Sequence, residues 1–450
     1  MKILASAFAV AALALQVGCS TPPRSAAERA DAVLRDLADR HLFQGAAVFG
    51  RGGVVEYAEG FGFADVERRV PFTPATPTDG ASIAKTFTAT ALLLLAGEGR
   101  IDLEARVREF LPTFPHAATR VRHLLAHSAG LPSYEWLDSR VTPDEPRTNA
   151  SHLAVVARDA PTPSFPPGTS FEYDNVAYDV AAMVVERVTD SSFADLVTAR
   201  FSRPLGLETF VRPARFSEWS GTRTRGYRRT ASGFADHDAY DLEGFYGADN
   251  IYLSARDLYR WVAGYRDLLG ATTSRVAVDS TTLDDGRATG ISRGSWYVSS
   301  DGNRRYYTGH HNGFFNFGYA DDGRSLAVAW VANDAPPPWL QPALSRALIA
   351  IAEGRDPEPL VPPAAADTTV DPSGVYRVPR VGEAAVRHEG DRLVVRLRGV
   401  DYDAFPVAPG VRYLPGLDGY LRFARAPNGQ ITLSWDSVFI VAASVARVEP

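Results

Sequence analysis

A Pro- and Ala-rich stretch, Asp356 to Pro372, divides this 450-residue chain into two parts that we expect to fold around separate cores. Its sequence, DPEPLVPPAAADTTVDP, has the composition of an interdomain linker. A chain of this length also exceeds what a single core usually supports. We therefore predict a large domain over residues 20–355, a linker over 356–372 and a small domain over 373–450.

The large part has strand-like runs at both ends and helical patterns between them. Near its start, two β-rich runs at 45–50 and 54–61 flank Arg51-Gly52-Gly53 and predict a hairpin. Helical periodicity marks residues 26–42, 82–96, 176–188, 254–269 and 339–352, and strand-like runs mark 294–299, 314–320 and 325–331. This order predicts an α+β fold, an antiparallel sheet covered by helices.

The small part alternates apolar and polar residues in short segments. These segments are 375–378, 392–397, 420–423 and 431–435, and Gly, Pro, Asn and Asp separate them. The pattern predicts a small antiparallel β-barrel or sandwich. It contains no cluster of catalytic side chains, so we expect a structural or ligand-binding role.

The first 19 residues have the features of a secretory signal. Lys2 precedes an apolar run from Ile3 to Leu15, which is too short to span a membrane. Cys19, the one cysteine of the chain, follows Gly18 and resembles a lipoprotein cleavage site, although Gln16 stands where that motif has leucine. We expect an exported bacterial protein, periplasmic or membrane-anchored through Cys19; simple secretion and a buried free thiol are the alternatives, and a single cysteine allows no internal disulfide.

The charge of the chain gives no indication of nucleic-acid binding, and its use of lysine indicates a candidate base. The net charge is −6 and the arginines are scattered, so the sequence has no footprint of nucleic-acid binding. Of 47 basic residues only Lys2 and Lys85 are lysines. Codon bias explains why lysines are few but not why one remains at Lys85. Lysine, unlike arginine, can lose its proton and act as a base.

Lys85 lies three residues after Ser82, at the predicted start of a helix. This spacing places both side chains on one face within one turn. The outward N–H groups of a helix start stabilise negative charge, such as an alkoxide or oxyanion at Ser82. Alone, Ser-x-x-Lys is also compatible with a capping serine and a surface lysine.

Further motifs follow in a fixed order along the large part. They are Ser82-Ile83-Ala84-Lys85, Val121 to Ser133 with its Leu-Leu-Ala-His-Ser-Ala-Gly-Leu core, Tyr173-Asp174-Asn175, Pro204-Leu205-Gly206-Leu207, Gly247 to Leu258, and His311-Asn312-Gly313. Together they resemble the serine β-lactamase and penicillin-binding protein superfamily over roughly residues 30–353, most closely its class C, D-aminopeptidase and esterase branch. The resemblance implies a β-lactamase/transpeptidase-like fold, with a helical subdomain, a sheet with helices on both faces, and the site between them.

The resemblance also implies roles for individual residues. Ser82 would be the nucleophile, Lys85 and Tyr173 the base pair, and Tyr173 also the proton donor to the leaving group. Asn175 would hold Lys85 and the carbonyl on the acyl side of the substrate. The backbone N–H groups of Ser82 and Phe314 would form the oxyanion hole.

The third motif departs from true β-lactamases. His311 with Gly313 stands where the family has Lys-Thr-Gly or His-x-Gly, and His310 is the competing assignment. A lysine there holds a substrate carboxylate with a fixed cation, whereas a histidine is mostly neutral at pH 7. This difference favours an esterase, amidase or D-amino-acid peptidase over a dedicated β-lactamase.

His123 and His127 stand four residues apart, a spacing that can bind metal on a helix. No glutamate follows His123, and the resemblance treats this segment as packing beside the site. We therefore expect neither a metal nor a cofactor, and no dinucleotide or phosphate-binding loop is present.

The leading hypothesis is an exported serine hydrolase that forms an acyl-enzyme on Ser82 with an ester, amide or D-amino-acid peptide. One alternative is an enzyme that binds penicillin or hydrolyses β-lactams. The other is a non-catalytic envelope-binding protein that uses the C-terminal β-domain. The expected partner is a small-molecule or peptide substrate, with possible membrane attachment through Cys19, and the oligomeric state is left open.

Overall fold

The computed structural model describes residues 24–141, 147–211, 223–230, 233–238, 244–363, 366–379 and 381–448. The predicted signal segment and Cys19 lie outside these residues. None of the described helices is long and apolar enough to cross a membrane.

A six-stranded antiparallel sheet forms the centre of the large part, in the order β12-β13-β14-β15-β1-β2. Its strands come from both ends of that part: β1 (Gly45–Arg51) and β2 (Val54–Phe61), then β12 (Tyr297–Val298), β13 (Arg304–His311), β14 (Phe314–Asp321) and β15 (Leu326–Ala332). The strands from the two ends are joined into one sheet because β1 pairs with β15, with Val48 opposite Ala329. Strands β14 and β15 are buried along their whole length, which explains their nearly continuous apolar sequences.

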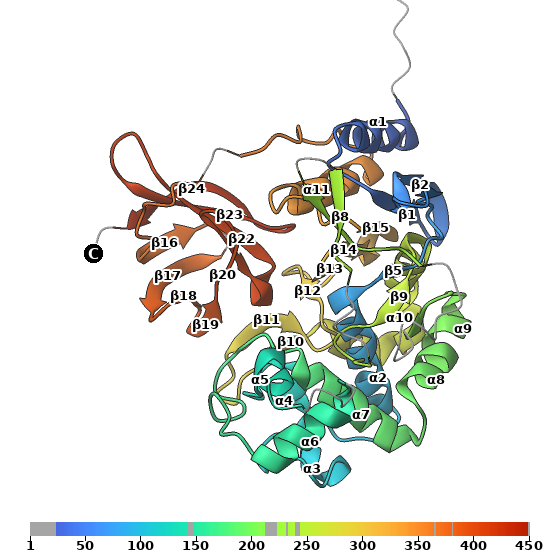
Figure 1. The fold of residues 1–450 in the computed structure, drawn as a ribbon, viewed down its shortest axis with the longest axis vertical. Helices are drawn as coiled ribbons and strands as arrows, with labels where there is room; N and C mark the ends of the chain where they lie inside the picture. The colour runs from blue at the N-terminus through green and yellow to red at the C-terminus, as the bar shows by residue number, and fades with distance from the viewer. Residues whose placement is uncertain are drawn as a thin grey trace, which may run out of the picture.

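Helices cover both faces of this sheet (Figure 1). On one face lie α1 (Ala26–Asp39) and α11 (Leu340–Ala352); on the other lie α2 (Ala84–Gly97) and the long α10 (Ala255–Val278). Helix α1 begins with a capping box, in which Ser25 and Glu28 satisfy each other's backbone N–H groups. The long helix α10 is interrupted at Gly270, whose φ is 69°.

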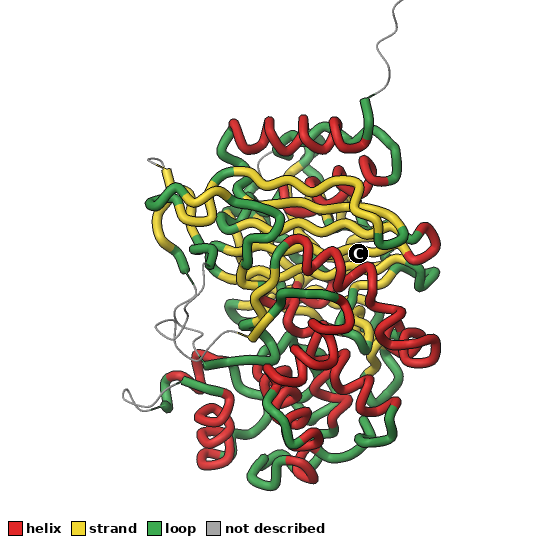
Figure 2. Tube along the Cα trace, turned by 90° about the vertical axis from the view of Figure 1, so that its right-hand side faces the viewer, coloured by secondary structure: helices red, strands yellow, loops and turns green. Residues whose placement is uncertain are grey.

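A helical subdomain lies at one end of the sheet (Figure 2). It packs around α7 (Val176–Thr189), which contacts α2 and several shorter helices: α3 (Val107–Phe110), α4 (Val121–Leu125), α6 (Asn149–Asp159) and α8 (Phe193–Val197). Helix α2 is buried on nearly every side, so it belongs to the core of both the sheet and the subdomain. The N-terminal end of α2 therefore lies at the boundary between them.

The C-terminal part is a nine-stranded antiparallel sheet, in the order β19-β18-β17-β16-β24-β23-β22-β21-β20. Its strands are β16 (Gly374–Val378), β17 (Gly382–Glu389), β18 (Arg392–Leu397), β19 (Val400–Asp403), β20 (Phe405–Ala408), β21 (Val411–Leu414), β22 (Gly419–Arg425), β23 (Ile431–Asp436) and β24 (Val441–Val448). The sheet curves around buried Tyr376, Leu433 and Trp435. No helix or strand is present over described residues 354–363 and 366–373, which join it to α11.

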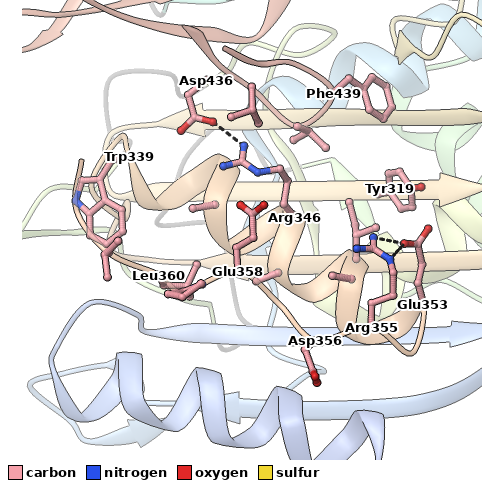
Figure 3. Close-up of a pocket in the computed structure, with 18 of the residues that line it drawn as sticks. Tyr319, Trp339, Arg346, Glu353, Arg355, Asp356, Glu358, Leu360, Asp436 and Phe439 are labelled. Carbon is pink, nitrogen blue, oxygen red and sulfur yellow. Dashed lines mark hydrogen bonds and ion pairs between the residues drawn. The ribbon is translucent and has the colours of Figure 1, made fainter. Parts of the chain in front are cut away.

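The two parts lie side by side (Figure 1), and a hydrogen bond from Tyr402 Oη to the Thr289 carbonyl is one of several that join them. A cavity of about 410 Å³ lies between α11, residues 355–363 and strands β23 and β24. Figure 3 shows Arg346 of α11 bound to Asp436 of β23, at 2.6 Å, beside Trp339 and Phe439. The catalytic residues predicted from the sequence do not line this cavity.

Candidate active site

Ser82 lies on a tight turn that leads into α2. The short 3-10 helix η1 (Ala81–Ile83) precedes α2, and Ala81 has a φ of 47°, an uncommon value for a residue with a Cβ. Neighbouring elements hold this turn: Ala81 N–H donates to Asp79 Oδ1 at 2.8 Å, and Asn316 of β14 donates to the Asp79 carbonyl at 2.8 Å. Ser82 is thus fixed at the end of the buried α2, with its side chain partly exposed.

The hydroxyl of Ser82 is the meeting point of two other side chains. Lys85 Nζ lies 3.1 Å from Ser82 Oγ, and Tyr173 Oη donates to Ser82 Oγ at 3.0 Å. Tyr173 comes from the segment just before α7, so the helical subdomain supplies it to the end of α2. The structure thus brings together the three residues predicted to be catalytic.

Lys85 is fully buried, and its position is fixed by more than the serine. Its ammonium donates to the Ala248 carbonyl at 3.2 Å and lies over the ring of Tyr173, 5.1 Å from the centroid. Asp179 accepts from the Ala248 N–H at 3.2 Å and so helps to hold this residue in place. Asn175 was expected to hold Lys85, but its buried Oδ1 finds no hydrogen-bond partner among the described residues. The Ala248 carbonyl occupies the acceptor position that we had assigned to Asn175.

Tyr173 is placed to donate a proton rather than to accept one. Burial raises its pKa above the usual value of a phenol, and the hydrogen bonds to Ser82 and Tyr307 only partly offset this. His127 stacks on the Tyr173 ring, with centroids 4.6 Å apart, and its Nδ1 lies 2.9 Å from the Asp174 N–H. Burial, with the charge of Lys85, lowers the pKa of His127 to about 3, so this imidazole is neutral.

The third motif lies four residues earlier on β13 than the sequence suggested. Tyr307 Oη is 3.4 Å from Tyr173 Oη, whereas no contact joins His311 to the catalytic residues described above. Gly309 passes so close to the Ser82 turn that a Cβ there would lie 2.1 Å from the Gly80 carbonyl oxygen. Tyr307-Thr308-Gly309 therefore occupies the position that we had assigned to His311-Asn312-Gly313. The signal was present in the sequence, because Thr308 and Gly309 match the last two residues of Lys-Thr-Gly.

Gly313 and Phe314 contribute to packing and strand pairing instead of lining the active site. A Cβ on Gly313 would lie 2.2 Å from the backbone nitrogen of Tyr227, so this glycine allows close packing away from Ser82. Phe314 pairs with His311 across a two-residue hairpin turn and is fully buried. Its N–H faces the hairpin partner, which removes Phe314 as a donor to an oxyanion.

The alternation of hydrogen bonds along β13 identifies a different donor. The Asn303 carbonyl bonds toward β14, at Asp322, and the Arg304 carbonyl bonds toward β12, at Ser299. Continuing this alternation, His310 directs its N–H away from β14, beyond the end of the short β12. The N–H groups of Ser82, at a helix start, and His310 are the candidate oxyanion donors.

The two histidines considered as metal ligands serve separate purposes. His123 Nε2 bonds Asp284 at 3.1 Å, whereas His127 packs behind Tyr173. Among the residues that the structure describes, no group of three or more His, Cys, Asp or Glu side chains could hold a metal ion.

Comparisons with known proteins agree with this geometry. The model of the family described as Beta-lactamase matches residues 30–353. A curated relative, penicillin-binding protein 4* of Bacillus subtilis (strain 168), is 30% identical over 183 residues, which are 40% of this chain and 41% of the relative. The chain therefore spans less than half the length of that relative.

Two solved structures share the fold. The octameric penicillin-binding protein homologue from Pyrococcus abyssi has a TM-score of 0.61 at 21% identity, covering 93% of this chain and 99% of that one. The D-amino acid amidase from Ochrobactrum anthropi SV3 has a TM-score of 0.57 at 22% identity, covering 69% and 91%. The predicted fold class, a β-lactamase/transpeptidase-like domain followed by an all-β domain, is confirmed.

Proposed function

Because this chain belongs to the β-lactamase family, whose model matches residues 30–353, we propose that it is a serine hydrolase that forms an acyl-enzyme on Ser82. One observation carries the proposal: Ser82 Oγ lies 3.1 Å from Lys85 Nζ and 3.0 Å from Tyr173 Oη. A serine hydroxyl becomes a good nucleophile only when a neighbouring base removes its proton. The arrangement supplies such a base and a second group for proton transfer.

The proposed mechanism assigns one task to each side chain. Once its ammonium has lost a proton to solvent, Lys85 takes the proton of Ser82 as Oγ attacks the carbonyl carbon of the substrate. The N–H groups of Ser82 and His310 stabilise the oxyanion, and Tyr173, which burial keeps protonated, donates its proton to the leaving group. The Lys85 proton then restores Tyr173, and water hydrolyses the acyl ester in a second step.

We propose an ester, an amide or a D-amino-acid peptide as substrate, in preference to a β-lactam. The reason is Tyr307, which lies where the family resemblance implies a lysine or a histidine and provides no fixed positive charge for a substrate carboxylate. The name of the Ochrobactrum anthropi neighbour, a D-amino acid amidase, is compatible with this class. The name of the Bacillus subtilis relative keeps penicillin binding as the second candidate.

Mass spectrometry after incubation with p-nitrophenyl esters and with a fluorescent penicillin tests both candidates. We expect the esters to produce an adduct on Ser82 and a burst of nitrophenol, and the penicillin to react more slowly. Rapid, stable labelling by penicillin would instead favour the second candidate. Absence of any adduct on Ser82, with Ser82→Ala as the control, would contradict both.

We also propose that the protein is exported and that Cys19 carries a lipid, on the basis of the signal-like sequence before it. Fractionation of cells that express the full chain, with Cys19→Ala as the comparison, tests this. Membrane association that depends on Cys19 is expected. A protein of unchanged mass in the cytoplasm would contradict it.

A further inference from the structure

The turn between β21 and β22 of the C-terminal domain docks beside the catalytic residues. This turn comprises Pro415 to Asp418, and the Pro415 carbonyl accepts a hydrogen bond from Tyr297 Oη. The Tyr297 ring stacks on that of Tyr307, with centroids 5.3 Å apart, and Tyr307 in turn contacts Tyr173. A short chain of aromatic residues thus connects the turn to the catalytic tyrosine.

The same turn also packs against the segment that carries Tyr173. Phe171, two residues before Tyr173, lies against Tyr402 of β19, with ring centroids 5.2 Å apart. A Cβ on Gly416 would lie 2.5 Å from the Phe171 ring, so the turn approaches this segment as closely as a glycine allows. The C-terminal domain therefore contacts both β13 and the segment that carries Tyr173, the proposed proton donor to the leaving group.

Asp418 brings a carboxylate to this side. Its Oδ1 accepts hydrogen bonds from Thr308 Oγ1, at 3.1 Å, and from Tyr413 Oη, at 2.8 Å. Thr308 is the residue between Tyr307 and Gly309, so the carboxylate is anchored directly on the strand beside Ser82. Asp418 is only 4% exposed and forms no ion pair with any described Lys, Arg or His. Its charge is thus not neutralised by any cation within the described ranges, and it acts in a poorly solvated position.

We propose that the C-terminal domain completes the leaving-group side of the active site, and that Asp418 selects against leaving groups that carry a carboxylate and in favour of those that carry a cation. This inference rests on the proposed hydrolysis through Ser82 and deepens it. A fixed carboxylate repels a second carboxylate and attracts an ammonium group, and low solvation increases both effects. The hydroxyl groups of Thr308 and Tyr413 hold Asp418 in place, and Tyr307 adds no opposing charge.

Three phenylacetyl thioesters that differ only in the leaving thiol test the proposal. The thiols are thiocholine, 2-mercaptoethanol and 3-mercaptopropionate, which carry a positive charge, no charge and a negative charge. In each reaction Ser82 Oγ bonds to the acyl carbon, the carbon–sulfur bond breaks and the protonated thiol is released. We expect kcat/KM at pH 8 to be at least tenfold higher for the thiocholine ester than for the mercaptopropionate ester.

The variant Asp418→Asn removes the charge and retains an oxygen that can accept from Thr308 and Tyr413. We expect it to reduce the ratio of the two kcat/KM values about tenfold or more. Asp418→Glu is expected to keep most of the ratio. The control Asp371→Asn removes an equal charge from an exposed site in the segment just before β16 and should leave the ratio unchanged.

Two outcomes would overturn the proposal, and the first needs only the unmodified enzyme. A ratio of one or less in the unmodified protein, or a ratio that Asp418→Asn leaves intact in a folded variant, would contradict it. The burst of nitrophenol from a p-nitrophenyl ester is measured separately. If that burst is present while the thioesters show no charge preference, the proposed function stands and the role of Asp418 is wrong. If Ser82 reacts with no ester at all, the proposed function itself fails.

Discussion

The two domains of this protein contribute buried charged groups to the same site in different ways. In the large domain, Lys85 is fully buried yet touches a hydroxyl, a carbonyl oxygen and an aromatic ring, and it stands next to a partly exposed serine. In the C-terminal domain, Asp418 is also buried, and it accepts hydrogen bonds from hydroxyl groups, among them those of Thr308 and Tyr413. The first group can reach the reacting atoms, whereas the second is anchored beside them.

This difference separates the requirements for chemistry from those for selection. A base must exchange a proton with the nucleophile, so it must stand within hydrogen-bonding distance of it. A charge that selects among substrates acts through its field and does not need contact with the reacting atoms. We therefore expect substitutions around Lys85 to abolish the reaction, and substitutions around Asp418 to change preference and stability.

Lys85→Arg should have the largest effect. Arginine retains the positive charge but does not give up its proton, so it cannot accept one from Ser82. We expect the rate of Ser82 acylation by p-nitrophenyl esters to fall by about 10³-fold or more. Stopped-flow release of nitrophenol measures this rate, and circular dichroism verifies that the variant is folded. A folded Lys85→Arg enzyme with near-normal acylation would show that Lys85 is not the base.

Tyr173→Phe should have a smaller effect that depends on the leaving group. Removal of the hydroxyl takes away the proposed proton donor but leaves the ring stacked on His127. We expect acylation to fall by roughly 10²-fold with an amide substrate, whose poor leaving group must be protonated. With a p-nitrophenyl ester the loss should be much smaller, since nitrophenolate departs without a proton. Equal losses with both substrates would indicate that Tyr173 acts as a base instead.

Much of the fold could be predicted from local patterns. The hairpin of β1 and β2, the long helices and the change to an all-β tail follow from periodicity, glycines and the Pro- and Ala-rich stretch. Strand β13 was not predicted because its sequence, RRYYTGHH, lacks the alternation of apolar and polar residues that marks a half-buried strand. That sequence reflects its position: Arg305 and Tyr307 face the large domain, whereas Tyr306 and Thr308 face the C-terminal domain.

The residues of the candidate site also differ in how far the sequence predicts them. Ser82 and Lys85 are neighbours on one helix, so their proximity follows from the sequence, and family resemblance added Tyr173. The third motif was assigned to His311 from residue identity alone, without regard to its spacing from the strand ends. In the structure Gly309, not Gly313, packs against the Ser82 turn. Asp418 could not be found in this way. Its nearness to Thr308 depends on how two domains dock, and neither local pattern nor motif encodes that contact.

Gly309→Ala tests the packing that defines the third motif. A Cβ at this position would lie 2.1 Å from the Gly80 carbonyl oxygen, and backbone on both sides leaves it little room to move. We expect a loss of about 2 kcal/mol or more in the free energy of unfolding, together with slower acylation because the Ser82 turn shifts. The control is Gly323→Ala, where the nearest atom is 3.4 Å away. Urea unfolding and nitrophenol release measure both quantities, and a stable, active Gly309→Ala would place the motif elsewhere.

The prediction with the smallest effect on acylation concerns the pH dependence of stability, and it compares one buried aspartate from each domain. Burial raises the pKa of Asp418 to about 6, and it raises the pKa of Asp334 to about 6 although Arg229 lies 2.7 Å away. A raised pKa means that the folded protein binds more protons than the unfolded chain between about pH 4 and pH 6. For each residue, this contribution to the free energy of unfolding is therefore greatest below pH 4 and is lost as the pH rises through 6.

Substitution by asparagine should change stability with pH in the same direction at both residues, but only Asp334→Asn also loses an ion pair. Asp418→Asn removes a buried charge that no described cation balances. We therefore expect the free energy of unfolding of the variant, relative to that of the unmodified protein, to be about 2 kcal/mol higher at pH 8 than at pH 4. Asp334→Asn removes the ion-pair partner of the partly exposed Arg229, so we expect this variant to be less stable than the unmodified protein at both pH values, with a smaller deficit at pH 8 than at pH 4. Urea unfolding at both pH values measures these differences. If Asp418→Asn lost stability at pH 8 as Asp334→Asn does, Asp418 would have a cationic partner in solution, and its proposed influence on the leaving group would lose its physical basis.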